Sequence, residues 1–156
     1  MNTGISYEII SNKALVIPAA AWVISQLLKV LVVLAREKRL DLGFLLRSGG
    51  MPSSHTALVC ALATAIAMTQ GFSSVTFAIT AILAIVVMYD AAGVRQAVGR
   101  QSKILNRMVK EFRVGRPRGE VERDLREFIG HTPFQVFAGA IVGILIAWLW
   151  LTISGG

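Results

Sequence analysis

The chain has few of the residues that proteins use to bind metals or to form cross-links. It holds one cysteine and two histidines among 156 residues, and nine acidic side chains against 16 basic ones. A single cysteine, Cys60, excludes a disulfide within the chain. Two histidines and one cysteine give no metal-ligand spacing, so we expect no zinc or other metal site and no cofactor.

Charged residues are also scarce, at 16%, whereas 54% of the residues are hydrophobic and the mean hydropathy is +0.64. The hydrophobic residues gather in four stretches, at residues 14–34, 56–68, 75–94 and 134–153. A helix of about 20 apolar residues crosses a bilayer. We therefore predict an all-α, integral-membrane helical bundle of about four spans, forming a single domain over residues 1–156. Pro18 interrupts the first stretch, which predicts an extra interfacial helix before it.

Basic residues are concentrated between these stretches. Besides Arg95, which directly follows the third stretch, thirteen of the 16 lie between the first and second stretches or between the third and fourth. With four spans both loops lie on one side, and the positive-inside rule predicts a multi-pass cell-membrane protein with these loops in the cytoplasm and both termini outside. The longer loop has helical spacing of apolar and basic residues, which predicts interfacial helices that meet anionic headgroups. It has two aromatic residues, Phe112 and Phe128, too few for a base-stacking platform, so no nucleic-acid partner is expected.

Both histidines lie in segments that open an apolar stretch. Residues 49–55 read Gly-Gly-Met-Pro-Ser-Ser-His, and residues 130–133 read Gly-His-Thr-Pro. Proline, serine and threonine are typical of helix starts, whose unpaired N–H groups favour a bound phosphate. A histidine there can give or take a proton near neutral pH. The sequence therefore predicts phosphoryl chemistry on a lipid that involves His55 and His131.

Two ionisable residues, Lys29 and Asp90, lie inside predicted spans at a similar depth. Such residues usually face a partner or a cavity, because burying a charge in a bilayer is costly. The alternatives are that Lys29 snorkels to the interface or forms a structural ion pair with Asp90. Gln26 lies one turn before Lys29 and makes that helix face polar. The cationic side chains of Lys29, Arg47 and Arg95, together with the two helix starts, can stabilise an anionic phosphoryl group.

The motifs resemble those of the type 2 phosphatidic acid phosphatase and vanadium haloperoxidase superfamily. Pro-Ser-Ser-His at 52–55 is similar to its Pro-Ser-Gly-His motif, and residues 130–143 resemble its third motif. With Asp-x-x-Gly-Val-Arg at 90–95, the chain resembles the divergent, small bacterial and plastid branch over about residues 26–143. The resemblance implies that His131 is the nucleophile that forms a phosphohistidine and that His55 is the general acid. It also implies that the phosphate is held by serines and basic side chains, for which we nominate Ser53, Ser54, Lys29, Arg47 and Arg95.

The chain departs from the superfamily pattern where an aspartate orients the nucleophilic histidine, because that position is Gln135. Glutamine can accept the imidazole N–H but carries no charge, and loss of the equivalent carboxylate in a serine protease costs about 10⁴ in rate. Asp90 is our candidate to supply the carboxylate. The superfamily's arginine before the nucleophile is out of register at Arg126, so Arg95 is expected to replace it.

The sequence leaves two classes of function open. The first is a metal-independent lipid phosphatase acting on a headgroup such as phosphatidylglycerophosphate or phosphatidic acid, or on an isoprenoid phosphate. The alternative is a catalytically inactive relative that binds anionic lipid or scaffolds a membrane partner. Gly139 and Gly143 have a small-xxx-small spacing that packs helices within or between chains, so a homo-oligomer is also open.

Overall fold

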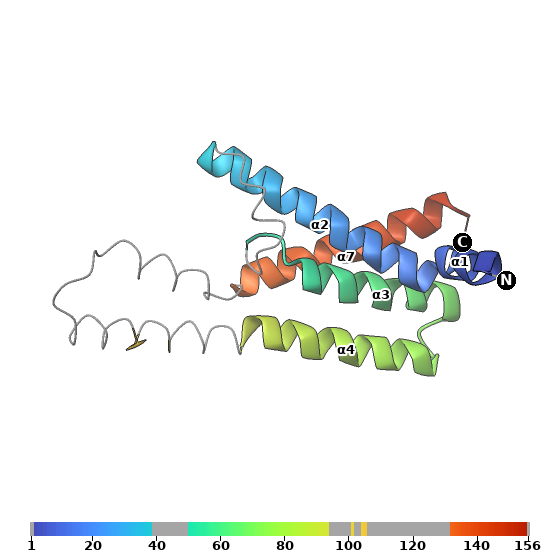
Figure 1. Cartoon of the computed structure of the whole chain (residues 1–156). Helices are drawn as coiled ribbons and strands as arrows, with labels where there is room; N and C mark the ends of the chain where they lie inside the picture. Colours follow the sequence, from blue (N-terminus) through green and yellow to red (C-terminus); the bar gives the residue numbers. More distant parts are fainter. Residues whose placement is uncertain (1, 39–49, 94–100, 102–103, 106–131, 156) are drawn as a thin grey trace.

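The computed structural model describes residues 2–38, 50–93, 101, 104–105 and 132–155, and its secondary structure is helical (Figure 1). The helices of these residues are α1 (Asn2–Ser11), α2 (Lys13–Glu37), α3 (Ser54–Gln70), α4 (Val75–Ala92) and α7 (Pro133–Ile153). The predicted all-α fold class is confirmed. The interfacial helices predicted in the long basic loop lie outside the described residues, apart from residues 101, 104 and 105, which are helical.

Polar side chains cap the starts of α3 and α4, and the sequence predicted the first of these caps. Ser53 Oγ accepts the N–H of Thr56 at 3.4 Å at the start of α3, and Ser74 Oγ accepts the N–H of Phe77 at 3.1 Å at the start of α4. These bonds satisfy N–H groups that a helix start leaves unpaired. Pro133 is the first residue of α7, where its missing N–H costs nothing.

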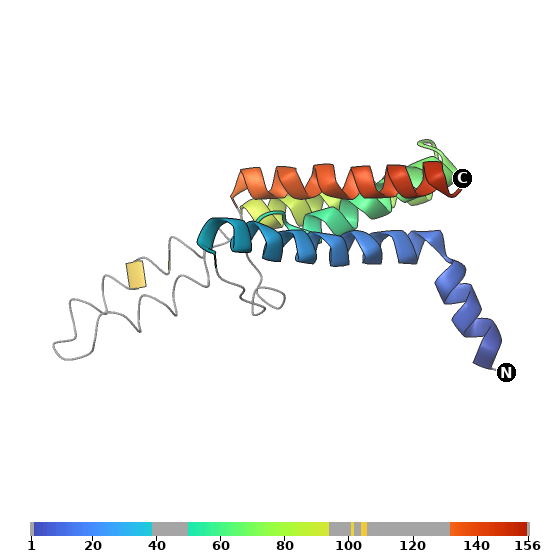
Figure 2. The same cartoon turned by 90° about the horizontal axis from the view of Figure 1, so that it is seen from above.

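The predicted interruption at Pro18 is wrong, because α2 runs through this residue from Lys13 to Glu37. An extra N-terminal helix is present, but it ends earlier, at Ser11. The break lies at Asn12, whose side chain caps α2 by accepting the N–H of Ala14 at 3.0 Å. At this break α1 turns away from the axis of α2 (Figure 2).

Three helices are long and apolar enough to cross a membrane in the part of the chain that the structure describes. They are residues Lys13–Ala35 of α2, Val75–Ala92 and Pro133–Ile153. The fourth predicted span corresponds to α3, which has 17 residues, at the short end of the usual spanning range. The structure is therefore an integral-membrane helical bundle with a short helix inside it.

Helix α3 lies at the centre of the bundle. It packs against α2, α4 and α7, whereas α2 and α4 do not pack against each other in the described residues. Helices α3 and α7 run in the same direction, opposite to α2 and α4, so α3 and α7 begin at the end of the bundle where α2 and α4 finish (Figure 1). Both chain termini lie at the opposite end (Figures 1 and 2).

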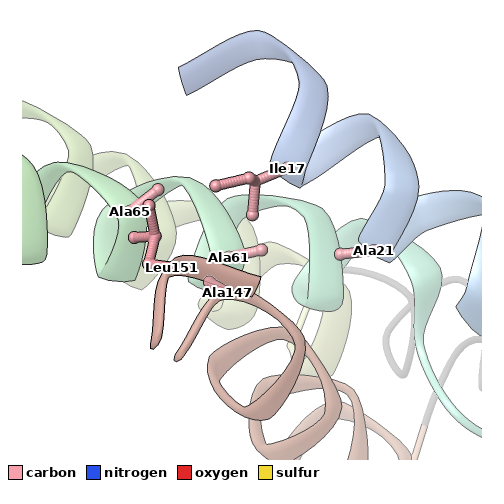
Figure 3. Packing of buried hydrophobic residues seen from close by; sticks show 6 residues of the cluster. All are labelled: Ile17, Ala21, Ala61, Ala65, Ala147 and Leu151. Atoms are coloured by element: carbon pink, nitrogen blue, oxygen red, sulfur yellow. The ribbon is translucent and has the colours of Figure 1, made fainter. Parts of the chain in front are cut away.

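Small residues allow these helices to approach closely. The buried cluster between α2, α3 and α7 consists of Ile17, Ala21, Ala61, Ala65, Ala147 and Leu151 (Figure 3). One turn before Ala147, a Cβ on Gly143 would lie 2.9 Å from the Cα of Ala57 and would also meet its carbonyl oxygen. The glycine face of α7 therefore packs within the chain, against α3, in the manner of small-residue contacts in membranes.

Candidate phosphate-binding site

The buried face of α2 changes from apolar to polar along its length. Ile17 and Ala21 belong to the apolar cluster, and the next residues at helical spacing, Ser25 and Lys29, are 0% and 1% exposed. Gln26, beside them, is 8% exposed. The buried polar residues therefore lie in the half of α2 that approaches the start of α3.

The start of α3 contributes a second group of buried polar residues. Ser53, Ser54 and Thr56 are at most 1% exposed. Ser53 Oγ accepts the N–H of Thr56 and also accepts the Thr56 hydroxyl at 3.0 Å. Because both of these bonds are accepted by Ser53 Oγ, its own hydrogen is left to donate. This geometry suits an anionic ligand.

The starts of α3 and α7 touch. The backbone N–H of Ser53 donates to the carbonyl oxygen of Gln135 at 3.1 Å. One turn further along α7, a Cβ on Gly139 would meet the carbonyl oxygen of Ser53 and would lie 3.1 Å from the Cβ atoms of Ser53 and Thr56. The two segments that carry the histidines therefore lead into helix starts that are in direct contact.

His55 is the second residue of α3, and its side chain is exposed while its neighbours Ser54 and Thr56 are buried. It thus lies at the edge of the buried polar group rather than inside it. His131, Arg47 and Arg95 lie outside the described residues, so their predicted roles stay predictions. His131 directly precedes Thr132, the N-cap of α7.

Lys29 lies deep in the bundle. It is eight residues before Glu37, the last residue of α2, which corresponds to about 12 Å along the helix. At 1% exposure it does not run along the outer surface as a snorkelling lysine does. Gly50, three residues before Ser53, lies against its aliphatic stem: a Cβ on Gly50 would lie 3.0 Å from Cγ and 3.1 Å from Cδ of Lys29.

Asp90 has a different environment from Lys29. Helix α4 ends at Ala92, so Asp90 lies in its last turn, and its side chain is exposed. The two residues therefore differ in exposure: Lys29 is buried two turns before the end of α2, whereas Asp90 is exposed in the last turn of α4. Their similar depth in the membrane stays a prediction. No ion pair joins Asp90 to Lys29 in the structure. Whether Asp90 supplies a carboxylate to His131 stays a prediction.

Gln135 has a role that the sequence interpretation missed. Its Oε1 accepts the backbone N–H of Thr132 at 3.1 Å, as in a capping box that opens α7. The signal was present, because Thr-Pro-Phe-Gln places a glutamine three residues after a threonine. Thr56 and Gly50 were also missed. Thr56 had a signal in its spacing from Ser53, whereas the contact of Gly50 with Lys29 joins segments 21 residues apart and had none.

Comparison with known proteins agrees with these features. The chain matches the Divergent PAP2 family over residues 10–146. It belongs to this family. The divergent PAP2 chain is also 36% identical over 148 residues to the Uncharacterized membrane protein YuiD of Bacillus subtilis (strain 168). The aligned region covers 89% of this chain and 94% of that protein. No solved structure matches it.

Membership of the Divergent PAP2 family confirms the resemblance inferred from the two histidine motifs and points to a phosphatase-related role. The name of the Bacillus relative and the three apolar helices agree that this is a membrane protein. In the described residues, no group of three or more His, Cys, Asp or Glu side chains lies together as a metal site would require.

Proposed function

We propose that this divergent PAP2 protein is a lipid phosphatase that hydrolyses a phosphomonoester or diphosphate headgroup through a phosphohistidine. The observation that carries the proposal is the contact between the starts of α3 and α7 beside the buried Lys29. Binding groups and reacting groups for one phosphate are then supplied by adjacent helix ends. The family match supports the same chemistry.

The phosphate is held by the Lys29 ammonium, by the Ser53 and Ser54 hydroxyls and by the first-turn N–H groups of α3. Arg47 and Arg95 add positive charge, and Gln26 supports the polar face of α2.

An imidazole nitrogen of His131 attacks phosphorus and the P–O bond to the lipid breaks, while protonated His55 gives its proton to the leaving oxygen. In the second step, neutral His55 takes a proton from water as the water oxygen attacks phosphorus. The P–N bond breaks, which releases phosphate and restores His131. Asp90 orients and stabilises the charged imidazole of His131.

The orientation of the site follows from the basic loops. The positive-inside rule places both loops, and hence the starts of α3 and α7, at the cytoplasmic face of the cell membrane. This favours phosphatidylglycerophosphate or phosphatidic acid, presented on that face, over an isoprenoid diphosphate on the outer face. Tags on either terminus should be accessible to an impermeant reagent in intact cells. A C-terminus protected until the cells are opened would overturn this orientation.

The function is tested by phosphate release from a panel of phospholipid monoesters and isoprenoid diphosphates, using purified detergent-solubilised protein in EDTA. We expect release in the parent protein, loss in His131→Ala and His55→Ala, and a large decrease in Asp90→Asn. Glu8→Gln, an exposed carboxylate at the opposite end of the bundle, is the control and should retain activity. Release that persists in both histidine variants would contradict the phosphohistidine route.

The second candidate is a catalytically inactive relative that binds anionic lipid or scaffolds a membrane partner. The observation that favours it is the use of Gln135 Oε1 to cap α7, since a neutral side chain engaged with Thr132 does not replace the superfamily's aspartate. This candidate predicts no phosphate release from any substrate. It also predicts binding to vesicles that contain phosphatidic acid, weakened by Lys29→Met, and no binding to phosphatidylcholine vesicles.

A further inference from the structure

Gly50 occupies an unusual position beside the deepest charged residue that the structure describes. Its φ of +92° is a conformation that side-chain-bearing residues rarely adopt. Its Cα faces the Lys29 stem so closely that a Cβ would lie 3.0, 3.1 and 3.7 Å from Cγ, Cδ and Cε. The segment that leads into α3 therefore packs along nearly the whole lysine side chain.

We infer that Gly50 is a positioning residue that holds the ammonium group of Lys29 toward the phosphate at the start of α3. The inference rests on the proposed function, in which Lys29 binds that phosphate. Gly50 would not touch the phosphate itself, and it acts through Lys29. Its contribution is a close backbone contact that restricts the conformations of the Lys29 stem.

The physical reason is the flexibility of lysine. A lysine side chain has four rotatable bonds, and holding it in one conformation costs about 2 kcal/mol of rotamer entropy. A stem packed against fixed backbone has already lost that freedom before the ligand arrives. A methyl group at residue 50 would lie 3.0 and 3.1 Å from Cγ and Cδ, which is tighter than an ordinary contact, so the stem would have to shift by a few tenths of an ångström. A shift at Cγ and Cδ is passed on to the ammonium at the end of the side chain.

The alternative explanation is that Gly50 is needed only for its positive φ, which lets the backbone turn at this point. Gly71 separates the two explanations, because it has a similar φ of +84° but only Ser73 Oγ near its Cβ position, at 4.0 Å. Gly50→Ala and Gly71→Ala therefore both place an alanine at a positive φ. Only the first also displaces Lys29.

The first experiment is reductive methylation of the purified protein in detergent, read by mass spectrometry. In the parent protein we expect Lys29 to be protected and the exposed Lys38 to react, which provides an internal standard. Methylation of Lys29 should rise severalfold in Gly50→Ala and stay at the parent level in Gly71→Ala. Equal protection of Lys29 in all three proteins overturns the inference, whatever the activity.

The second experiment is a double-mutant cycle on phosphate release. Gly50→Ala should lower kcat/KM about 10- to 100-fold in the parent, as expected for a misplaced binding group. Lys29→Met keeps an unbranched stem but removes the ammonium. In the Lys29→Met background, Gly50→Ala should therefore cause no further loss in kcat/KM.

The outcomes separate this inference from the proposed function. An equal fractional loss from Gly50→Ala in both backgrounds means that Gly50 is purely structural and overturns the inference while the phosphatase stands. Absence of phosphate release from the folded parent overturns the proposed function, and with it the role of Lys29. If Lys29→Met is too slow to measure, the methylation result decides the positioning role.

Discussion

The backbone N–H of Ser53 donates a hydrogen bond to the carbonyl oxygen of Gln135 at 3.1 Å, which ties the N-cap of α3 to the first turn of α7. The two residues are 82 positions apart in the chain. Helix α7 can come this close because Gly139, one turn later, has no side chain facing Ser53. The relative position of the two histidine-bearing segments therefore depends on a few backbone contacts.

Gly139→Ala should separate these helix starts. The new methyl group would meet the carbonyl oxygen of Ser53, and overpacking of this kind costs about 1–3 kcal/mol. We expect a lower thermal transition in detergent and a loss of phosphate release larger than the loss of folded protein. Gly4→Ala, in α1, has nothing within 4 Å of the new methyl group and should behave like the parent. An active, fully stable Gly139→Ala protein would contradict the described contact.

Thr56→Val should reduce activity with little effect on folding. The change keeps the shape of the side chain but removes the hydroxyl that donates to Ser53 Oγ at 3.0 Å. Ser53 is then less constrained as a donor to phosphate, and we expect kcat/KM to fall several-fold. Thr64→Val is the matched control, because Thr64 donates to the Cys60 carbonyl in the same helix and away from the site. Equal activity in both variants would remove Thr56 from the site.

Gln135→Glu should stabilise the protein and raise its activity. A glutamate can still accept the Thr132 N–H, and a negative charge in the first turn of a helix adds about 0.3–1 kcal/mol. The charge also restores a carboxylate near the proposed nucleophile. Gln135→Leu removes the cap and should lower stability by about 1 kcal/mol. Thermal unfolding and phosphate release of the two variants test both effects, and lower activity in Gln135→Glu would argue against a missing carboxylate.

Ser25→Ala should be neutral for activity and slightly stabilising. Ser25 Oγ is fully buried and has no hydrogen-bond partner in the described structure. Removing a buried hydroxyl without a partner relieves a penalty of about 1–3 kcal/mol. Ala21→Ser, one turn earlier in the apolar cluster, is the reverse change and should lower the transition temperature. A strong loss of phosphate release in Ser25→Ala would instead place this hydroxyl in the phosphate site.

The sequence predicted the elements better than their contacts. Apolar length and the residues at helix starts placed α3, α4 and α7 to within a few residues, because both signals are local. Pro18 was misread because a proline early in a long apolar helix is tolerated when packing stabilises the rest. The exposure of Asp90 was not predicted, because it depends on the tertiary packing around the end of α4.

The candidate site was predictable only in part. Ser53, Ser54 and Lys29 were chosen from residue type and position; the structure shows that all three are buried, and their roles in binding phosphate stay predictions. The contact between Lys29 and Gly50 depends on the tertiary path of the chain, which no local pattern encodes. The cap made by Gln135 was predictable from its position three residues after Thr132, because the signal is local.

The shortness of α3 has a consequence for the membrane itself. Gly50, just before α3, packs against Lys29, and α2 continues from Lys29 for two more turns before it ends at Glu37. Figure 1 shows α2 extending beyond the start of α3. The polar residues at the start of α3 therefore lie further inside the bundle than the end of α2 (Figure 1). Under the proposed function, we expect a lipid phosphate to leave the plane of the neighbouring headgroups to reach these residues. The hydrocarbon tail of a lipid can anchor it in the membrane during this step, whereas a water-soluble phosphate ester has no such anchor.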